Sequence, residues 1–258
     1  ESYWRPFFHG FDFVHRWLDR HRPDVAVVFS NDHGLNFFLD AIPTFAVGAA
    51  PEYCNADEGW GLPVAPPIGG EPELSWRLID ALVAAEFDVT MCQRMLVDHA
   101  IMVPMQLLWP DRRWPKIIPV SINTVQHPLP SAARCLKLGR TIGRALDAFP
   151  SDAKVVLIGT GGLSHQLDGA RAGFINREFD QFCLDRIAVE PDFLSRYSTA
   201  DLVKLAGSQG VEVLNWIAMR GALTGAATEA HRNYHIPISN TAAATLVLDH
   251  QASLSEAA

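Results

Sequence analysis

Two histidines and one glutamate could form a chemical site. The histidines follow apolar segments at polar turns, and the glutamate lies inside an apolar segment. The apolar run 24–29 leads into Ser-Asn-Asp and then His33, and the run 154–158 leads into a glycine-rich turn that ends at His165. Glu212 lies within residues 210–219, which are otherwise apolar nearly all round. A buried carboxylate is costly unless it is paired, hydrogen-bonded or bound to a metal. This trio suits either a non-haem Fe(II) centre or a catalytic zinc site with open coordination positions.

The two apolar runs predict where the histidines meet. Continuous apolar runs of this length are typical of strands in a parallel sheet that is buried on both faces. Open α/β sheets bind ligands beyond the carboxyl ends of such strands, so we expect His33 and His165 at one rim. Ordinary alternatives stay open: His33 could be a surface histidine in a turn, and Glu212 could face the N-terminus of its own helix, where negative charge is favoured.

Further polar residues stand beside predicted helices. His99 follows Asp98 and precedes an apolar helix, where it is either functional or an ordinary helix-start residue. Ser239 and Asn240 could hydrogen-bond a small ligand or cap a helix that begins at Thr241. The turn at 159–162 lacks both the GxGxxG spacing and a Gly-Lys-Ser/Thr sequence, so we do not expect a nucleotide there.

Composition narrows the class of protein. The chain has 258 residues, of which 48% are hydrophobic, and no stretch that looks like a linker, so we expect one domain over 1–258. A net charge of −8 argues against a nucleic-acid or anionic-membrane partner. The four cysteines form no CxxC pair, and no apolar stretch approaches the ~20 residues of a membrane span. We therefore expect reduced thiols and a cytoplasmic location.

Alternating strands and helices predict an α/β sandwich, with a central mostly parallel or mixed sheet flanked by helices. We expect strands at 24–29, 44–48, 88–90, 116–122 and 154–158. Helices are expected at 11–21, 72–86, 100–108, 134–149, 178–187 and 208–220, the last of them ended by Gly221. Residues 51–72 are rich in glycine and proline and predict an irregular surface loop.

Seven short motifs occur in an order that points to a known family. They are Ser-Asn-Asp-His at 30–33, Ala-Asp-Glu-Gly-Trp-Gly at 56–61, Val-Asp-His at 97–99, Gly-Thr-Gly-Gly-Leu-Ser-His-Gln-Leu at 159–167, Arg-Ala-Gly at 171–173, Gly-Val-Glu at 210–212 and Ile-Pro-Ile-Ser-Asn-Thr-Ala at 236–242. Together they resemble the class III extradiol ring-cleavage dioxygenases, and most of all the catalytic β subunits of protocatechuate 4,5-dioxygenases. The likeness runs from Tyr3 to about Leu248.

The resemblance implies a mononuclear Fe(II) enzyme that opens protocatechuate beside its paired hydroxyls with O2, giving 4-carboxy-2-hydroxymuconate 6-semialdehyde. Gallate and 3-O-methylgallate are the alternative substrates. By position, His33 and Glu212 would be iron ligands. His165 would be the acid/base residue next to substrate and oxygen, and His99 would hydrogen-bond the hydroxyl or oxygen ligands. An imidazole suits proton transfer because it titrates near neutral pH.

The resemblance also implies contacts and partners. Ser239 and Asn240 would lie near the carboxylate of the aromatic ring. The β subunits of the family pair with a small helical α subunit in an α2β2 assembly, so that partner is implied too.

One departure from the family pattern concerns the metal. The family has a further histidine ligand in a Ser-His-x-Pro turn after the first strand, ahead of the counterpart of Tyr3. That motif does not occur in this sequence, and His9 and His15 fall on a predicted helical segment. We expect the further ligand upstream of Glu1, and weak iron binding without it. The alternative is a non-catalytic relative that has lost its metal site.

Overall fold

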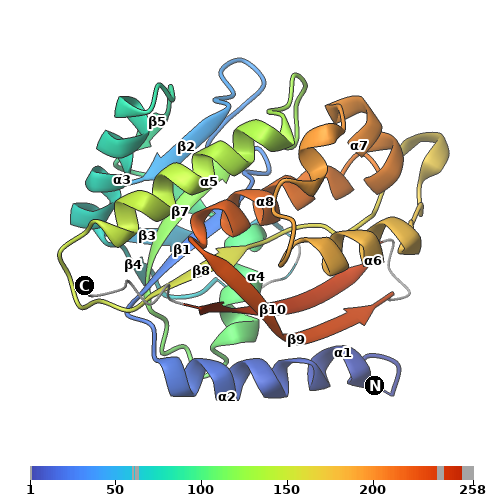
Figure 1. Cartoon of the computed structure of the whole chain (residues 1–258), viewed down its shortest axis with the longest axis horizontal. Helices are drawn as coiled ribbons and strands as arrows, with labels where there is room; N and C mark the ends of the chain where they lie inside the picture. The colour runs from blue at the N-terminus through green and yellow to red at the C-terminus, as the bar shows by residue number, and fades with distance from the viewer. Residues whose placement is uncertain (1, 60, 62–63, 237–240, 252–258) are drawn as a thin grey trace, which may run out of the picture.

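A five-stranded mixed sheet forms the centre of the molecule (Figure 1). The computed structural model describes residues 2–59, 61, 64–236 and 241–251. In spatial order the strands are β5 (Thr90–Cys92), β2 (Phe45–Gly48), β7 (Lys116–Ile122), β1 (Val25–Ser30) and β8 (Val155–Gly159). β1 is parallel to β7 and β8, and β2 is parallel to β5, whereas β2 and β7 are antiparallel. The predicted α/β class, with a mostly parallel, mixed sheet, is confirmed.

Each face of this sheet is covered by its own hydrophobic core. Side chains alternate across a strand, so Val25, Val27 and Phe29 of β1 face one core and Ala26 and Val28 face the other. The first core packs against α3 (Pro72–Ala84), α5 (Ala132–Asp147) and α8 (Val213–Ala222). The second packs against α4 (His99–Leu108) and a small sheet of β4 (Ile68–Gly69), β3 (Glu52–Asn55) and β6 (Leu96–Val97). Figure 1 shows α5 and α8 on the near side and α4 behind.

Two further groups of elements complete the fold. The antiparallel pair β9 (Ala226–His235) and β10 (Ala243–Gln251) lies beside α1 (Arg5–His9) and α2 (Phe11–His21) in Figure 1. Val14 and Leu18 of α2 form a small core with Val247 of β10. The short helices α6 (Arg177–Arg186) and α7 (Thr199–Ala206) follow the His165 turn.

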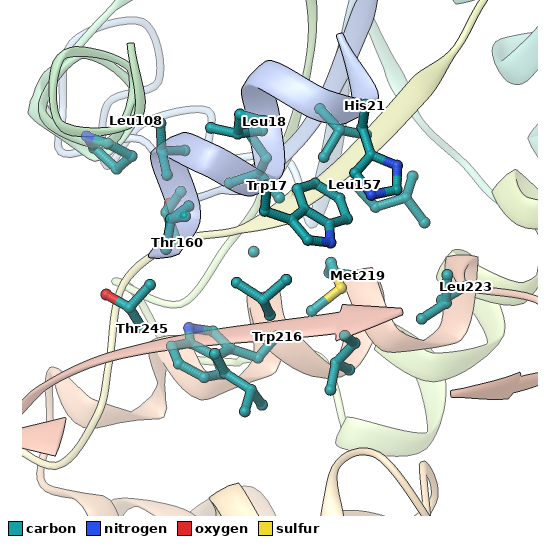
Figure 2. Close-up of a pocket in the computed structure, with 18 of the residues that line it drawn as sticks. Trp17, Leu18, His21, Leu108, Leu157, Thr160, Trp216, Met219, Leu223 and Thr245 are labelled. Carbon is teal, nitrogen blue, oxygen red and sulfur yellow. The ribbon is translucent and has the colours of Figure 1, made fainter. Parts of the chain in front are cut away.

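The sheet has an open edge at β8. All five residues of this strand are half-buried, whereas every residue of β1 is buried, so the prediction of two covered faces holds for β1 and is wrong for β8. A cavity of about 870 Å³ runs along this edge between α2, α4, α8 and β10. Figure 2 shows Trp17, Leu157 and Trp216 around it. The cavity is mainly apolar near these residues and reaches the glycine turn that follows β8.

Three local predictions are wrong for identifiable reasons. Residues 51–72 are not wholly irregular, because β3 and β4 pair within them. The helix predicted from 208 to 220 begins as a 3-10 turn at Gly210–Glu212 and continues as α8 past Gly221. Gly221 is therefore no cap: a Cβ there would lie 2.5 Å from the carbonyl oxygen of Leu136, so the glycine allows α8 to pack closely on α5.

Segments without strong apolar periodicity were missed or misread. Thr241 does not begin a helix; it forms an isolated bridge with His165 and is followed by β10. Strand β9 carries polar side chains at most positions, and neither β9 nor α7 was among the predicted elements. Among the described residues no helix is long and apolar enough to cross a bilayer. All four cysteines are free, as expected.

Candidate functional site

The turns that follow β1 and β8 begin side by side, because these strands are parallel neighbours with Phe29 opposite Gly159. His33 and His165 come from these two turns, and Glu212 comes from the 3-10 turn before α8. Nε2 of His33 lies 3.5 Å from Oε1 of Glu212. Nε2 of His165 lies 4.0 Å from the other carboxylate oxygen. The structure thus brings together three residues that are far apart in sequence, with the carboxylate between the two imidazoles.

Glu212 is only 9% exposed and is held by hydrogen bonds on both oxygens. Oε1 accepts from Nδ2 of Asn31 at 3.3 Å, and Oε2 accepts from the backbone N–H of Gly162 at 2.9 Å. The turn can approach this closely because Gly161 has no side chain: its φ is +80°, and a Cβ would lie 2.6 Å from Oε2. Burial alone would raise the pKa of Glu212, but the His33 hydrogen bond, the His165 charge and the Gly162 N–H hold that pKa below its usual value.

A second carboxylate orients His33 from behind. Oδ2 of Asp98 accepts hydrogen bonds from the backbone N–H and from Nδ1 of His33, both at 3.0 Å. The other oxygen accepts from the backbone N–H of Ala100 and so caps α4. Because Nδ1 carries a proton and donates it to a hydrogen bond with Asp98, Nε2 is the ring nitrogen that faces Glu212. A carboxylate in this position is typical of metal-binding histidines.

Charge around His33 favours a cation. Burial by itself would lower the pKa of His33, but the hydrogen bonds and charges of Asp98 and Glu212 raise it to about 10. Burial likewise acts to raise the pKa of Asp98, yet its contacts with His33 lower it. Two ionised carboxylates therefore share one imidazole, and the surplus negative charge attracts either a proton or a metal ion.

His165 is fixed by its own backbone surroundings. The residue is 6% exposed, its Nδ1 lies 2.9 Å from the carbonyl oxygen of Leu163, and its backbone N–H donates to Ala206. In the neutral ring, Nδ1 thus carries the proton and Nε2 faces Glu212. Ser164 points elsewhere, because its hydroxyl donates to Asp180 at 2.7 Å. Ser164 and His165 therefore form no nucleophile–base pair.

His99 lies against His33 at the start of α4. The two ring centroids are 4.1 Å apart, and Nδ1 of His99 lies 2.7 Å from Oε1 of Glu58. His33, Asp98 and His99 also offer ligand atoms that all lie within 4.8 Å of one another. The described residues therefore offer two possible donor sets around His33: His33 with Glu212, or His33 with Asp98 and His99. Ser239 and Asn240 lie outside the described residues.

The site opens toward solvent on one side. The side chains of His33 and His99 are 28% and 24% exposed, whereas those of Glu212 and His165 are 12% and 7% exposed. The two buried residues form the floor and the two half-buried imidazoles line the mouth. Among the described residues, the solvent-exposed part of the site therefore consists mainly of the imidazoles of His33 and His99.

Sequence reasoning missed the residues behind the histidines. Asp98 had a readable signal, because an aspartate directly before an apolar helix is a common N-cap. Glu58 belongs to the motif at 56–61, but its contact with His99 had no signal, because the two residues are 41 positions apart. Asn31, which joins Glu212 to Asn215 of α8, was visible only as a polar turn residue.

Comparison with solved structures supports the fold. A crystal structure of the uncharacterized protein JW3007 from Escherichia coli K12 matches with a TM-score of 0.58 at 17% identity. The match covers 91% of this chain and 91% of the other. At this identity the similarity concerns the fold alone.

Several sequence relatives are named as dioxygenases of aromatic compounds. Gallate dioxygenase of Pseudomonas putida is 39% identical over 198 residues, which are 76% of this chain and 58% of the relative. The 2,3-dihydroxyphenylpropionate/2,3-dihydroxicinnamic acid 1,2-dioxygenase of Photorhabdus laumondii is 35% identical over 159 residues, covering 62% of this chain and 48% of the relative. The corresponding enzyme of Rhodococcus globerulus is 29% identical over 295 residues, covering 95% and 88%. The chain thus spans about half the length of the first two relatives.

A family model matches nearly the whole chain. Residues 1–244 match the family described as the catalytic LigB subunit of aromatic ring-opening dioxygenase. This span includes all of the residues that form the mouth and the floor of the site. The chain belongs to the family of the catalytic LigB subunit of aromatic ring-opening dioxygenases.

Proposed function

We propose that this protein is an Fe(II)-dependent extradiol dioxygenase that opens a carboxylated catechol beside its paired hydroxyls with O2. The observation that carries the proposal is the buried carboxylate of Glu212, faced by His33 and His165 at a rim that solvent can reach. Family membership supports the same reaction class.

The residues present fit a divalent metal. His33 offers Nε2 because Asp98 binds its Nδ1, and Glu212 offers an ionised carboxylate. The charge that raises the pKa of His33 to about 10 is also the charge that a divalent cation would neutralise. We assign His33 and Glu212 as two iron ligands and the histidine expected upstream of Glu1 as the third. When bound, the iron would acidify a coordinated hydroxyl and hold ring and O2 together.

Two histidines would handle protons and hydrogen bonds. His165 is the proposed acid/base residue: with its Nδ1 proton directed at Leu163, Nε2 can take a proton from a substrate hydroxyl and later return it. His99 is the proposed hydrogen-bond partner of the hydroxyl or oxygen at the mouth. Ser239 and Asn240 remain proposed contacts of the substrate carboxylate, and a small helical α subunit remains a proposed partner.

Protocatechuate is the first proposed substrate, and gallate is the second. The motif pattern is the basis for protocatechuate, and the 39% identity to a gallate dioxygenase supports gallate, which carries the same carboxylate and one hydroxyl more, as the alternative. Steady-state kcat/KM on protocatechuate, gallate and 3-O-methylgallate separates these substrates. A clear preference for gallate or its methyl ether would overturn the first choice and leave the reaction class intact.

Anaerobic Fe(II) reconstitution followed by oxygen-electrode assay tests the reaction itself. The chain is assayed alone, with a Ser-His-x-Pro segment of the family joined upstream of Glu1, and with an α subunit added. We expect oxygen uptake and a yellow ring-opened product that depend on Fe(II) and are not restored by Zn(II). Absence of uptake in all three preparations would favour a non-catalytic relative. Restoration by Zn(II) without O2 would point to a hydrolase.

A further inference from the structure

Both carboxylate oxygens of Glu58 contact one residue, His99. Oε2 accepts the backbone N–H of His99 at 2.7 Å, and Oε1 lies 2.7 Å from the ring nitrogen Nδ1. The Glu58 side chain is only 13% exposed although it comes from the segment between β3 and β4. A long-range contact therefore joins this segment to the first residue of α4.

The backbone contact completes the N-terminus of α4. The first N–H groups of a helix have no partner within it, and negative charge is favoured at that end. Asp98 accepts from Ala100, and Glu58 accepts from His99, so two carboxylates satisfy two successive N–H groups. Glu58 is thus part of the helix cap as well as a partner of the imidazole.

The ring contact selects one form of the imidazole. A carboxylate only accepts hydrogen bonds, so the Nδ1 of His99 that faces it carries the proton. In the neutral ring Nε2 is then an acceptor. The ring plane is further limited by its packing on His33, at 4.1 Å between centroids.

We propose that Glu58 is a positioning residue that holds His99 as its Nδ1–H tautomer and so presents Nε2 as an acceptor to a substrate hydroxyl. The inference deepens the proposed function and rests on it for the identity of that hydroxyl. The tautomer itself is a property of the free protein and can be measured without substrate or metal.

Glu58→Gln makes a sharp test because the amide cannot replace both oxygens. The backbone N–H of His99 still requires an acceptor, so the amide oxygen will take that place. The amide NH2 then faces Nδ1, which must become an acceptor, and the proton moves to Nε2. The substitution preserves size and cap but reverses the tautomer.

The measurement is long-range ¹H–¹⁵N correlation NMR of the imidazoles in the metal-free full chain, at a pH where His99 is neutral. We expect Nδ1–H in the wild type, Nε2–H in Glu58→Gln, and a mixture in Glu58→Ala. Asp57→Asn is the matched control, because it removes one carboxylate in the same turn, whose partner is the N–H of Gly59. Its His99 should remain Nδ1–H.

Turnover of the Fe(II)-loaded protein provides the second measurement. We expect kcat to fall roughly 10–100-fold in Glu58→Gln, the range usual for residues that hydrogen-bond a functional histidine, while its Fe(II) affinity stays near that of the wild type. The kcat of the control Asp57→Asn should also stay near that of the wild type. A Nδ1–H His99 in Glu58→Gln with unchanged kcat would overturn the inference. If the tautomer reverses but even the wild type opens no ring, Glu58 still sets the tautomer of His99, whereas the proposed function and the substrate hydroxyl fail.

Discussion

Asp98→Asn separates a carboxylate that orients a ligand from one that binds the metal. Asp98 is 4% exposed and accepts three hydrogen bonds, from the backbone N–H of Ala100 and from the backbone N–H and Nδ1 of His33, each at 3.0 Å. Asparagine has the same shape but replaces one oxygen with an NH2 donor. Either Ala100 or His33 must then lose its acceptor, whichever way the amide is turned.

The size of the effect follows from these contacts. A buried backbone N–H without an acceptor costs about 1–3 kcal/mol, and we expect that loss in the free energy of unfolding of the metal-free protein. If the amide oxygen stays on Ala100, Nδ1 of His33 faces a donor and the ring proton moves to Nε2, the nitrogen that should bind iron. Loss of such a partner typically weakens metal binding about 10–100-fold. This corresponds to about 1.4–2.8 kcal/mol.

Urea unfolding and anaerobic Fe(II) titration measure the two effects on the same preparation. Glu212→Ala should lose the metal itself, and His99→Ala should keep it, because His99 is not in the proposed ligand set. An Asp98→Asn protein that is destabilised but binds Fe(II) normally would make Asp98 a helix cap only. Loss of iron in both Asp98→Asn and His99→Ala, with Glu212→Ala unaffected, would refute the proposed ligands and favour the His33–Asp98–His99 set.

Three other substitutions probe the same rim. His165→Ala should bind Fe(II) normally but lower turnover by roughly 10²–10⁴-fold, and full turnover would remove its acid/base role. Gly161→Ala should weaken Fe(II) binding, because its Cβ would lie 2.6 Å from Oε2 of Glu212. Gly34→Ala is the matched control, because the φ of Gly34 is +79°, close to the +80° of Gly161, and no atom lies within 4 Å of its Cβ. An equal loss of Fe(II) binding in both variants would contradict the prediction. Asp180→Asn should change stability in a pH-dependent way: burial outweighs the hydrogen bonds from Ser164 and Tyr234 and raises the pKa of Asp180 in the folded state. The contribution of the carboxyl group to stability is therefore fully present below its unfolded pKa and is lost as pH rises through the folded pKa. In urea unfolding at a series of pH values above about 4, the free energy of unfolding of Asp180→Asn should rise relative to that of the wild type. A difference that does not change with pH would contradict this.

The sheet and the shared rim of His33 and His165 were readable from the apolar runs, because runs this short that are bounded by turn residues favour strands over helices. Val25–Ser30 and Val155–Gly159 are too short and too apolar for surface helices, so parallel strands followed, and with them a shared carboxyl rim. Glu212 stood out because an ionisable residue within an apolar helix needs a partner. None of these inferences required knowledge of pairing order.

The rest depended on contacts between distant segments. Strand β9 is polar at most positions, and it is held by pairing with β10 and by contacts such as Tyr234 to Asp180. Gly221 resembled a helix stop, because close packing between helices leaves the same mark in a sequence as a cap. Glu58 stood out only as part of the motif at 56–61, and nothing in the sequence indicated its contact with His99, which lies 41 positions away.

The start of α4 connects these observations. Asp98 and Glu58 each accept one of its first backbone N–H groups, and each also contacts Nδ1 of a histidine at the mouth of the site. Helix capping and imidazole orientation are therefore served by the same two carboxylates. Because the N-terminal N–H groups of a helix require acceptors in any case, the fold holds both carboxylates where His33 and His99 need them. The two carboxylates that cap the start of α4 thus also fix the orientation of the imidazoles of His33 and His99.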